Sequence, residues 1–260
     1  DMTDIDFDQA VEDFWQASQG GAFPVQWQDT FDRETAYRIC LAMIERRSAI
    51  GDAQAGWKVG LTAKAIREQQ GATEPVFAVL YDSGRWQSGV SHPYSDLMRP
   101  GWENELCLTM GVTLKGPGVT EDQVKAAVAT IAPALEIIEQ RPPPGKGSGF
   151  LSGADNGQQR SFIVGTETAY DASIHDLGKA SVEVFVDGKF EEKAFGIEVM
   201  ESSPLSSIVW LTEGLSRFGH ELTAGSVVMT GSFTKQYRFE GPVEVEARFE
   251  PFGTVTASFT

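Results

Sequence analysis

The sequence is poor in the residues from which many enzyme sites are built. It contains two cysteines and three histidines among 260 residues. Cys40 and Cys107 lie in apolar stretches and are too few for a disulfide framework, so we expect both to be buried thiols. His92, His175 and His220 are scattered without the spacing of a zinc site. Any metal in this protein is therefore expected to be held by oxygen ligands.

Positive charge is also scarce. The chain has 21 lysines and arginines against 37 aspartates and glutamates, which gives a formal net charge of −16. Such a surface repels phosphate backbones and anionic lipids. No apolar run approaches the roughly 18 residues that span a bilayer, and the acidic start Asp1-Met2-Thr3-Asp4 lacks the order of a signal peptide. We expect a cytoplasmic protein with no nucleic-acid partner and no membrane partner.

The motifs of several large enzyme classes are missing. No Gly-x-Gly-x-x-Gly follows a strand, and the chain has neither a phosphate-binding loop nor a Gly-x-Ser-x-Gly elbow. Strands and helices do not alternate regularly, as they would in a doubly wound sheet. Nucleotide binding and serine hydrolysis therefore have no support in the sequence.

The hydrophobic pattern predicts two parts. In residues 1–52 apolar residues fall at helix spacing, and a second helix is expected to start near Asp29-Thr30. From residue 53 to residue 260 short apolar stretches alternate with turn signals, which favours an all-β or a mixed-β domain. Local signals there predict a strand at Gly56–Leu61, a hairpin at Asp187-Gly188, and helices over 63–70, from Thr120 to about Ile131 and over Ser206–Phe218.

Glu103 and Glu105 are two positions apart in an apolar stretch, so they would face the same side of a strand. Two carboxylates about 7 Å apart repel by about 2 kcal/mol at an effective dielectric of about 20. A divalent cation would reverse the sign of that interaction. Two ordinary glutamates on a solvated sheet face would show the same spacing, and the spacing alone leaves both alternatives open.

Glu136 and Lys58 are two further charged residues in apolar surroundings. A buried carboxylate at position 136 needs a cation, which could be a hard metal or an arginine such as Arg141. Lys58 lies in a strand flanked by glycines, where it is either a solvated edge residue or a sheltered proton carrier with a lowered pKa beside a metal. These residues by themselves do not choose between the alternatives.

Taken in order, these segments resemble the 2-hydroxypenta-2,4-dienoate hydratase and 4-oxalocrotonate decarboxylase branch of the fumarylacetoacetate hydrolase superfamily. The likeness runs through most of the chain. It rests on Gly56-Trp57-Lys58-Val59-Gly60-Leu61-Thr62-Ala63-Lys64, residues 75–82, Arg99-Pro100-Gly101-Trp102-Glu103-Asn104-Glu105, residues 133–138, Ser203-Pro204-Leu205, Trp210-Leu211, residues 222–232 and residues 252–255.

The resemblance implies an α+β fold, in which residues 53–260 form a mixed β-roll and residues 1–52 an N-terminal helical segment. It implies a Mg²⁺ or Mn²⁺ ion held by Glu103, Glu105 and Glu136, and a homo-oligomer, commonly built from dimers. Lys58 would be the catalytic proton carrier. The substrate would lie against Leu80, Asp155, Asn156, Gln158, Thr230 and Ser232.

The implied chemistry is that of a lyase of aromatic catabolism acting on a 2-oxo or 2-hydroxydienoate acid. The ion would chelate the acid and stabilise its enolate. Water then adds to the conjugated acid in a hydratase, which we expect here, whereas carbon dioxide leaves in a 4-oxalocrotonate-type decarboxylase. A non-catalytic homologue that binds an acidic metabolite is a third alternative. Hydrolysis of carbon–carbon bonds by a histidine and a glutamate is not expected, because no histidine precedes His92.

Three segments depart from the family pattern. The family's usual Asp-Asn-Ala-Ser is Asp155-Asn156-Gly157-Gln158 here, Glu139-Gln140-Arg141 replaces Asp-Ser-Arg, and the loop 142–149 has its own composition. Glutamine in place of serine fills more space and offers amide donors. The sequence therefore indicates a different acid, or a differently oriented carbon tail.

Overall fold

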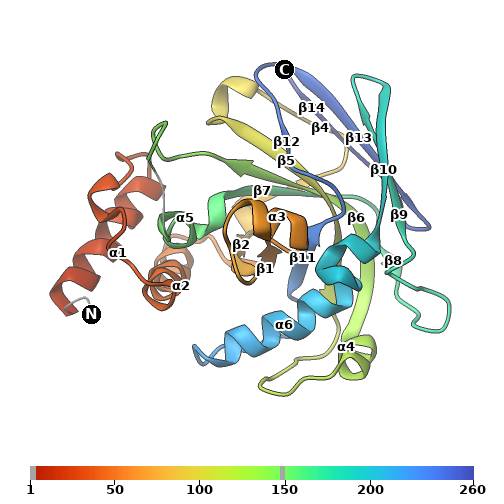
Figure 1. Ribbon diagram of the computed structural model, residues 1–260, viewed down its shortest axis with the longest axis horizontal. Helices are drawn as coiled ribbons and strands as arrows, with labels where there is room; N and C mark the ends of the chain where they lie inside the picture. The colour runs from red at the N-terminus through yellow and green to blue at the C-terminus, as the bar shows by residue number, and fades with distance from the viewer. Residues whose placement is uncertain (1–3, 147–149) are drawn as a thin grey trace.

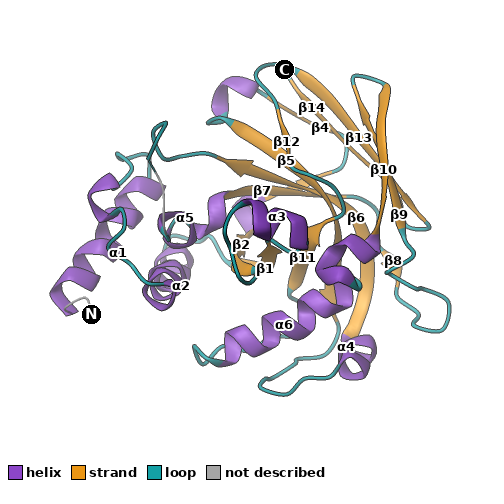
Figure 2. Cartoon of the chain, viewed as in Figure 1, coloured by secondary structure: helices purple, strands orange, loops and turns teal. Residues whose placement is uncertain are grey.

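The computed structural model describes residues 4–146 and 150–260. Residues 1–3 and 147–149, which include most of the acidic start and the end of the loop that departs from the family, lie outside the described residues. The described part contains two β-sheets with helices packed beside them (Figures 1 and 2). None of its helices is both long and apolar enough to cross a membrane.

The larger sheet has nine strands and is mixed. Two of its strand pairs, β1 with β11 and β3 with β7, are parallel. Strands β2 and β7 contact each other although four strands separate them in the sheet order, so this sheet is rolled. The order is β2 (Val76–Tyr81), β1 (Gln54–Gly60), β11 (Val227–Ser232), β5 (Pro100–Met110), β6 (Val128–Glu139), β7 (Gln159–Val164) and β3 (Arg85–Gln87), with β12 (Tyr237–Arg238) beside β5 and β8 (Thr168–Ala169) beside β6.

The second sheet has five strands and packs against the first, where β13 and β14 contact β6. Its order is β10 (Lys189–Phe195), β9 (Ser181–Val186), β13 (Val243–Glu250), β14 (Gly253–Phe259) and β4 (Val90–His92). The predicted hairpin joins β9 to β10, and both turn residues, Asp187 and Gly188, have the positive φ that such a tight turn requires. The α+β fold with a mixed β-roll is confirmed.

The helices confirm the predicted elements but shift some of their ends. The described helices are α1 (Asp4–Ser18), α2 (Arg33–Ala49), α3 (Lys64–Gln69), α4 (Glu121–Ala127), α5 (Leu151–Ala154) and α6 (Pro204–Ser216). Helix α2 begins after Asp32, whose carboxylate accepts a hydrogen bond from the Thr35 amide, and not at Asp29-Thr30. Helix α6 begins at Pro204, two residues before the predicted start, because Ser203 caps it.

The predicted capping box of Thr120 and Gln123 is present at the start of α4. The helix ends at Ala127, however, and not near Ile131, because residues from Val128 onward pair with β5. Pairing with β5 satisfies the backbone N–H and C=O groups of this segment. The helix therefore ends where that pairing begins.

Helices α1 and α2 lie at one side of the rolled sheet (Figure 1). Phe14 and Ile39 form a separate apolar cluster there together with Leu151 and Ala154 of α5. Tyr37 and Cys40 on another side of α2 join the main core of the sheet. The division of the chain at residue 52 therefore stays a prediction, with the helical part packed directly on the rest.

Alternation along the strands gives the rolled sheet two different faces. One face carries large apolar side chains, including Trp57, Leu106 and Leu135, and belongs to the main core. The other carries a smaller apolar cluster, with Cys107 and Ala134 on the same faces of β5 and β6 as the glutamates of the predicted metal site.

Candidate metal centre and active site

The three predicted metal ligands lie on two neighbouring antiparallel strands. Glu103 of β5 is directly opposite Glu136 of β6, and Glu105 follows two positions along β5 on the same face. Each of the three offers a carboxylate oxygen, and these oxygens all lie within 4.8 Å of one another. The register of β5 on β6 thus brings together residues more than thirty positions apart in the chain.

These carboxylates are largely removed from water. Glu105 and Glu136 are 0% exposed and Glu103 is half-buried. The Gly231 amide donates a hydrogen bond of 2.8 Å to Glu105 Oε2, while Glu105 Oε1 and Glu136 Oε2 have no hydrogen-bond partner in the described part of the chain. Burial and the carboxylates of Glu136 and Glu103 raise the pKa of Glu105 well above its usual range. Burial also raises the pKa of Glu136, and the ammonium of Lys58 opposes this.

The arrangement fits a divalent cation. At 4.8 Å and an effective dielectric of about 20, each pair of ionised carboxylates repels by about 3 kcal/mol. Two buried oxygens without hydrogen-bond partners are costly unless something occupies them. Carboxylate oxygens without nitrogen or sulfur ligands suit hard cations such as Mg²⁺, Ca²⁺ and Mn²⁺. That the three glutamates are metal ligands stays a prediction, now with a geometry that suits it.

Lys58 lies beside this cluster. Its strand, β1, runs between β2 and β11, and its side chain is 5% exposed, so the alternative of a solvated edge lysine is wrong. The ammonium is 3.0 Å from Glu136 Oε1 and donates to the Gly157 carbonyl at 2.8 Å. Burial alone would lower the pKa of Lys58, but the carboxylates of Glu136 and Glu103 raise it above its ordinary value. The lowered pKa expected beside a metal stays a prediction.

The alternative in which Glu136 pairs with Arg141 is also wrong. Arg141 donates to Asp155 at 2.8 Å and to Glu139 at 3.2 Å. Glu139 is three positions from Glu136 on β6, so the two side chains lie on opposite faces of the strand. Lys58 is the positive side chain that contacts Glu136.

A pocket of about 400 Å³ opens next to Lys58 and Glu103. Two of the residues predicted to bind substrate, Gln158 and Ser232, line it. Gln236 also lines it and donates a hydrogen bond of 3.2 Å to Glu103 Oε1. Sequence reasoning missed Gln236, since it lies in the loop after β11, where no residue pattern connects it with a strand far earlier in the chain.

Two other residues predicted to bind substrate, Leu80 and Thr230, are buried away from this pocket. Leu80 is fully buried in the small apolar cluster that contains Cys107. Thr230 is also fully buried, and its hydroxyl donates to the Leu106 carbonyl at 2.8 Å. Neither lines the pocket beside Lys58. Their contact with a substrate stays a prediction without a geometric counterpart.

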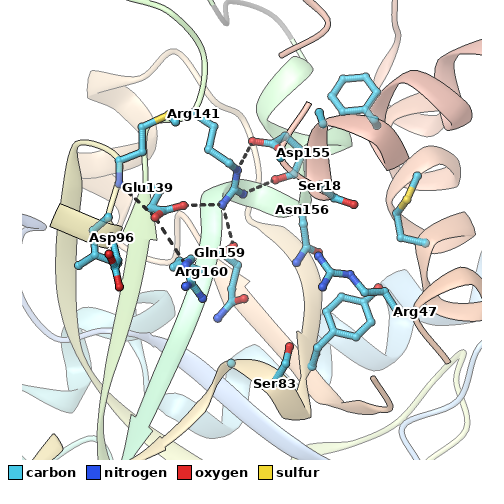
Figure 3. Close-up of a pocket in the computed structure, with 18 of the residues that line it drawn as sticks. Ser18, Arg47, Ser83, Asp96, Glu139, Arg141, Asp155, Asn156, Gln159 and Arg160 are labelled. Carbon is cyan, nitrogen blue, oxygen red and sulfur yellow. Dashed lines mark hydrogen bonds and ion pairs between the residues drawn. The ribbon is translucent and has the colours of Figure 1, made fainter. Parts of the chain in front are cut away.

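Asp155 and Asn156, also predicted to bind substrate, line a different and larger pocket of about 600 Å³ (Figure 3). There Arg141 lies between Glu139, Asp155 and Gln159. Because Glu139 faces this pocket and Glu136 the metal cluster, the two cavities flank opposite faces of β6. The carboxylate cluster and Lys58 therefore adjoin the smaller of these two pockets.

The comparisons with known proteins agree with the fold and with the family that the sequence resembles. No protein-family model matches the chain. It is 31% identical to a 2-hydroxyhexa-2,4-dienoate hydratase of Comamonas testosteroni over 229 residues, 87% of this chain and 86% of that protein.

Two solved structures extend this likeness. The 4-oxalocrotonate decarboxylase of Pseudomonas putida G7, complexed with magnesium and adipate, superimposes with a TM-score of 0.92 at 26% identity, over 100% of this chain and 99% of that one. A fumarylpyruvate hydrolase of Pseudomonas aeruginosa with Mn²⁺ and pyruvate shares the fold, with a TM-score of 0.58 at 18% identity over 78% of this chain and 88% of that one. The chain therefore belongs to the family of the dienoate hydratases and 4-oxalocrotonate decarboxylases, and it shares its fold with proteins of the fumarylacetoacetate hydrolase family.

Proposed function

We propose that this protein is a divalent-metal-dependent lyase that adds water to a 2-hydroxy-2,4-dienoate acid. The observation that carries the proposal is the buried ammonium of Lys58, 3.0 Å from Glu136 in a cluster of three carboxylates beside a pocket. The hydratase of Comamonas testosteroni, 31% identical, supports the reaction class. The substrate is a small-molecule 2-oxo or 2-hydroxydienoate acid.

Glu103, Glu105 and Glu136 would hold the cation, which we propose to be Mg²⁺ or Mn²⁺. When bound, such an ion acts as a Lewis acid that orients a 2-oxo acid and stabilises negative charge developing on its oxygens. The presence of magnesium in the decarboxylase structure and of Mn²⁺ in the fumarylpyruvate hydrolase structure supports a divalent ion of this kind.

Lys58 would move the proton. Its ammonium has three N–H groups, of which one points to Gly157 O and one lies toward Glu136. The third is available to a substrate in the adjoining pocket. Conversion of the 2-hydroxydienoate to its 2-oxo-3-enoate form requires a proton to leave the 2-hydroxyl and another to reach the carbon chain, and a buried, oriented amine can carry both transfers. Water then adds at C4 to give the 4-hydroxy-2-oxo acid.

Decarboxylation of 4-oxalocrotonate is the second candidate, since the decarboxylase structure superimposes over the whole chain. Both reactions need the same stabilised enolate. Gln158, Gln236 and Ser232 place polar groups around the pocket, and these can position a water molecule. A decarboxylase instead needs its leaving carboxylate in surroundings that do not hold it strongly. This difference favours hydration.

The test is to incubate the purified protein and Mg²⁺ with 2-hydroxypenta-2,4-dienoate and, separately, with 4-oxalocrotonate. The loss of dienol absorbance, the 4-hydroxy-2-oxo acid and the released carbon dioxide are all quantified. Hydrated product from the first substrate is the expected result. Carbon dioxide without hydrated product would make decarboxylation the activity. No turnover of either, with metal and substrate bound, would support the non-catalytic homologue.

We also propose a homo-oligomer that acts in the catabolism of aromatic compounds. The resemblance to a family of multimeric enzymes supports the assembly, and the dienoate hydratase relative supports the pathway class. Light scattering on the eluting protein measures the subunit number directly.

A further inference from the structure

The turn between Asp155 and Gln158 separates the two pockets. Asp155 and Asn156 line the larger pocket, whereas Gly157 and Gln158 line the one beside Lys58. Asn156, Gly157 and Gln158 all have left-handed backbone conformations, with φ of 54°, 60° and 64°. Two of the three, Asn156 and Gln158, are not glycine, and such residues are unfavourable in this region unless the surroundings hold them there. Contacts with Arg141 and with strand β2 hold the turn in this conformation.

Arg141 holds the first part of the turn (Figure 3). Its guanidinium donates to Asp155 Oδ2 at 2.8 Å and to the Asp155 carbonyl at 3.0 Å. It also donates to the Gln159 carbonyl, just after the turn, at 3.2 Å. Glu139 of β6 also accepts a hydrogen bond from this guanidinium, at 3.2 Å. Both ends of the turn are thus tied to one rigid, planar group.

Asn156 ties the middle of the turn to β2. Its amide nitrogen donates to the Val79 carbonyl at 2.9 Å, and its amide oxygen accepts from the Val79 N–H at 2.8 Å and from Cys40 Sγ at 3.2 Å. Strand β2 is at the end of the sheet order, so the side chain of Asn156 pairs with its free edge as a neighbouring strand would. Both ends of the amide are engaged, which leaves Asn156 little capacity to bind substrate.

These contacts place the turn next to Lys58. Val79 is next to Ala78, which is opposite Lys58 in the pairing of β2 with β1. With the turn fixed on β2, the Gly157 carbonyl accepts the hydrogen bond of 2.8 Å from Lys58 Nζ. A Cβ at position 157 would lie 2.9 Å from Lys58 Cε and 3.4 Å from Ala78 Cβ, so the absence of a side chain permits this approach.

We propose that Asn156 is a positioning residue, which fixes the Gly157 carbonyl on the ammonium of Lys58 and so orients that ammonium toward the substrate pocket. The inference rests on the proposed role of Lys58 in proton transfer. It assigns to Asn156 a function through Lys58 and not through contact with the substrate.

The test compares Asn156→Ala and Asn156→Asp with the parent protein and repeats both substitutions in a Lys58→Ala background. The aspartate variant has nearly the same shape but loses the donor to Val79 O. We expect kcat for dienoate hydration to fall on the order of 10- to 100-fold in the parent background, because displaced catalytic groups lose that much. KM and Mn²⁺ affinity, measured by electron paramagnetic resonance, should stay within about threefold.

In the Lys58→Ala background the same substitutions should change kcat by less than about twofold, because Asn156 then has no ammonium to position. Thr212→Val is the matched control, since it removes another buried side-chain hydrogen bond, to the Val209 carbonyl in α6, and should affect kcat similarly little in both backgrounds. A full, multiplicative loss in the Lys58→Ala background would overturn the proposal, as would a loss of Mn²⁺ affinity equal to the loss of kcat.

A crystal structure of Asn156→Ala gives a readout that does not need turnover. The expected result is a displaced turn in which Lys58 no longer contacts the Gly157 carbonyl, while Glu103, Glu105 and Glu136 keep their positions. An unchanged contact between Lys58 and Gly157 would contradict the proposal, even if the parent protein hydrates no dienoate. Failure of the proposed function and failure of the positioning role are thereby separate results.

Discussion

At the scale of single residues, the site combines charges that would not be stable together without a partner. Glu105 and Glu136 are buried within a few ångströms of each other, and Lys58 is one positive charge against three carboxylates. Buried charges persist where pairing or a metal compensates for desolvation. The residue-scale predictions follow from this excess of negative charge.

Glu105→Gln should abolish Mn²⁺ binding and lower turnover by on the order of 100-fold or more, and chelation of the parent protein should do the same. The amide keeps the shape of the side chain and can still accept from the Gly231 amide. Burial and the neighbouring carboxylates raise the pKa of Glu105, so ionising this side chain costs stability that the neutral amide of glutamine does not cost. The metal-free variant should therefore have a higher free energy of unfolding in urea at neutral pH than the metal-free parent. Full activity of the variant in chelator would contradict the assignment of the metal ligands.

Lys58→Ala should lower kcat by on the order of 100-fold while Mn²⁺ affinity stays nearly intact, because the amine moves protons and is not a ligand. Initial rates with saturating dienoate, together with Mn²⁺ titration, measure the two quantities separately. An increase in KM with unchanged kcat would instead mean that Lys58 only binds the substrate.

Gln236→Leu should weaken Mn²⁺ binding by about 10-fold, because the hydrogen bond that orients Glu103 Oε1 is lost. Gln70→Ala is the control, because Gln70 lines the same pocket and makes no hydrogen bond to a carboxylate among the described residues. Equal Mn²⁺ affinities in the parent and in Gln236→Leu would show that Glu103 does not need this support.

At the scale of elements, strand pairing positions the site and helix caps stabilise its surroundings. Lys58 is on β1, Glu103 and Glu105 on β5, and Glu136 on β6, all strands of one rolled sheet. Helix α4 lies between β5 and β6 in the chain. None of its residues lines the pocket beside Lys58. The stability of α4 and the activity of the site should therefore separate.

Thr120→Ala tests that separation. It removes the side chain that caps α4, where the Thr120 hydroxyl accepts from the Gln123 amide at 3.2 Å. We expect a loss of about 1 kcal/mol in the free energy of unfolding, measured in urea at constant metal concentration, with kcat unchanged. A large fall in kcat at full folding would show that α4 is coupled to the site.

At the scale of the whole molecule, the positions of the histidines bear on whether hydrolysis of carbon–carbon bonds is expected. His92 is on β4 of the second sheet, where its ring stacks on Trp86 at 4.3 Å. Within the described residues, no histidine lines the pocket beside Lys58. Hydrolysis of acylpyruvates should therefore be negligible, as an assay of released pyruvate coupled to lactate dehydrogenase can measure. Pyruvate formed at a rate comparable to dienoate hydration would overturn this expectation.

Local chemistry explains what could be predicted from the sequence. The capping box at Thr120, the turn at Asp187-Gly188 and the strand containing Lys58 depend on neighbouring residues alone, and the structure confirms them. The resemblance to the family correctly predicted the β-roll and named three glutamates that the structure brings together. Composition alone predicts that a metal site would consist of oxygen ligands, and the cluster of three carboxylates suits this prediction without testing it.

Tertiary structure decided the features of the fold and of the site that local sequence does not determine. These features depend on which strands pair and in which register. Only the pairing of β5 with β6 places Glu136 opposite Glu103, ends α4 at Ala127 and turns Glu139 to the other face. Likewise, only the rolled sheet brings Asn156 into contact with β2 and the Gly157 carbonyl into contact with Lys58. These contacts join segments about 30 to 100 positions apart, so no local preference encodes them; they follow from the burial of one common core.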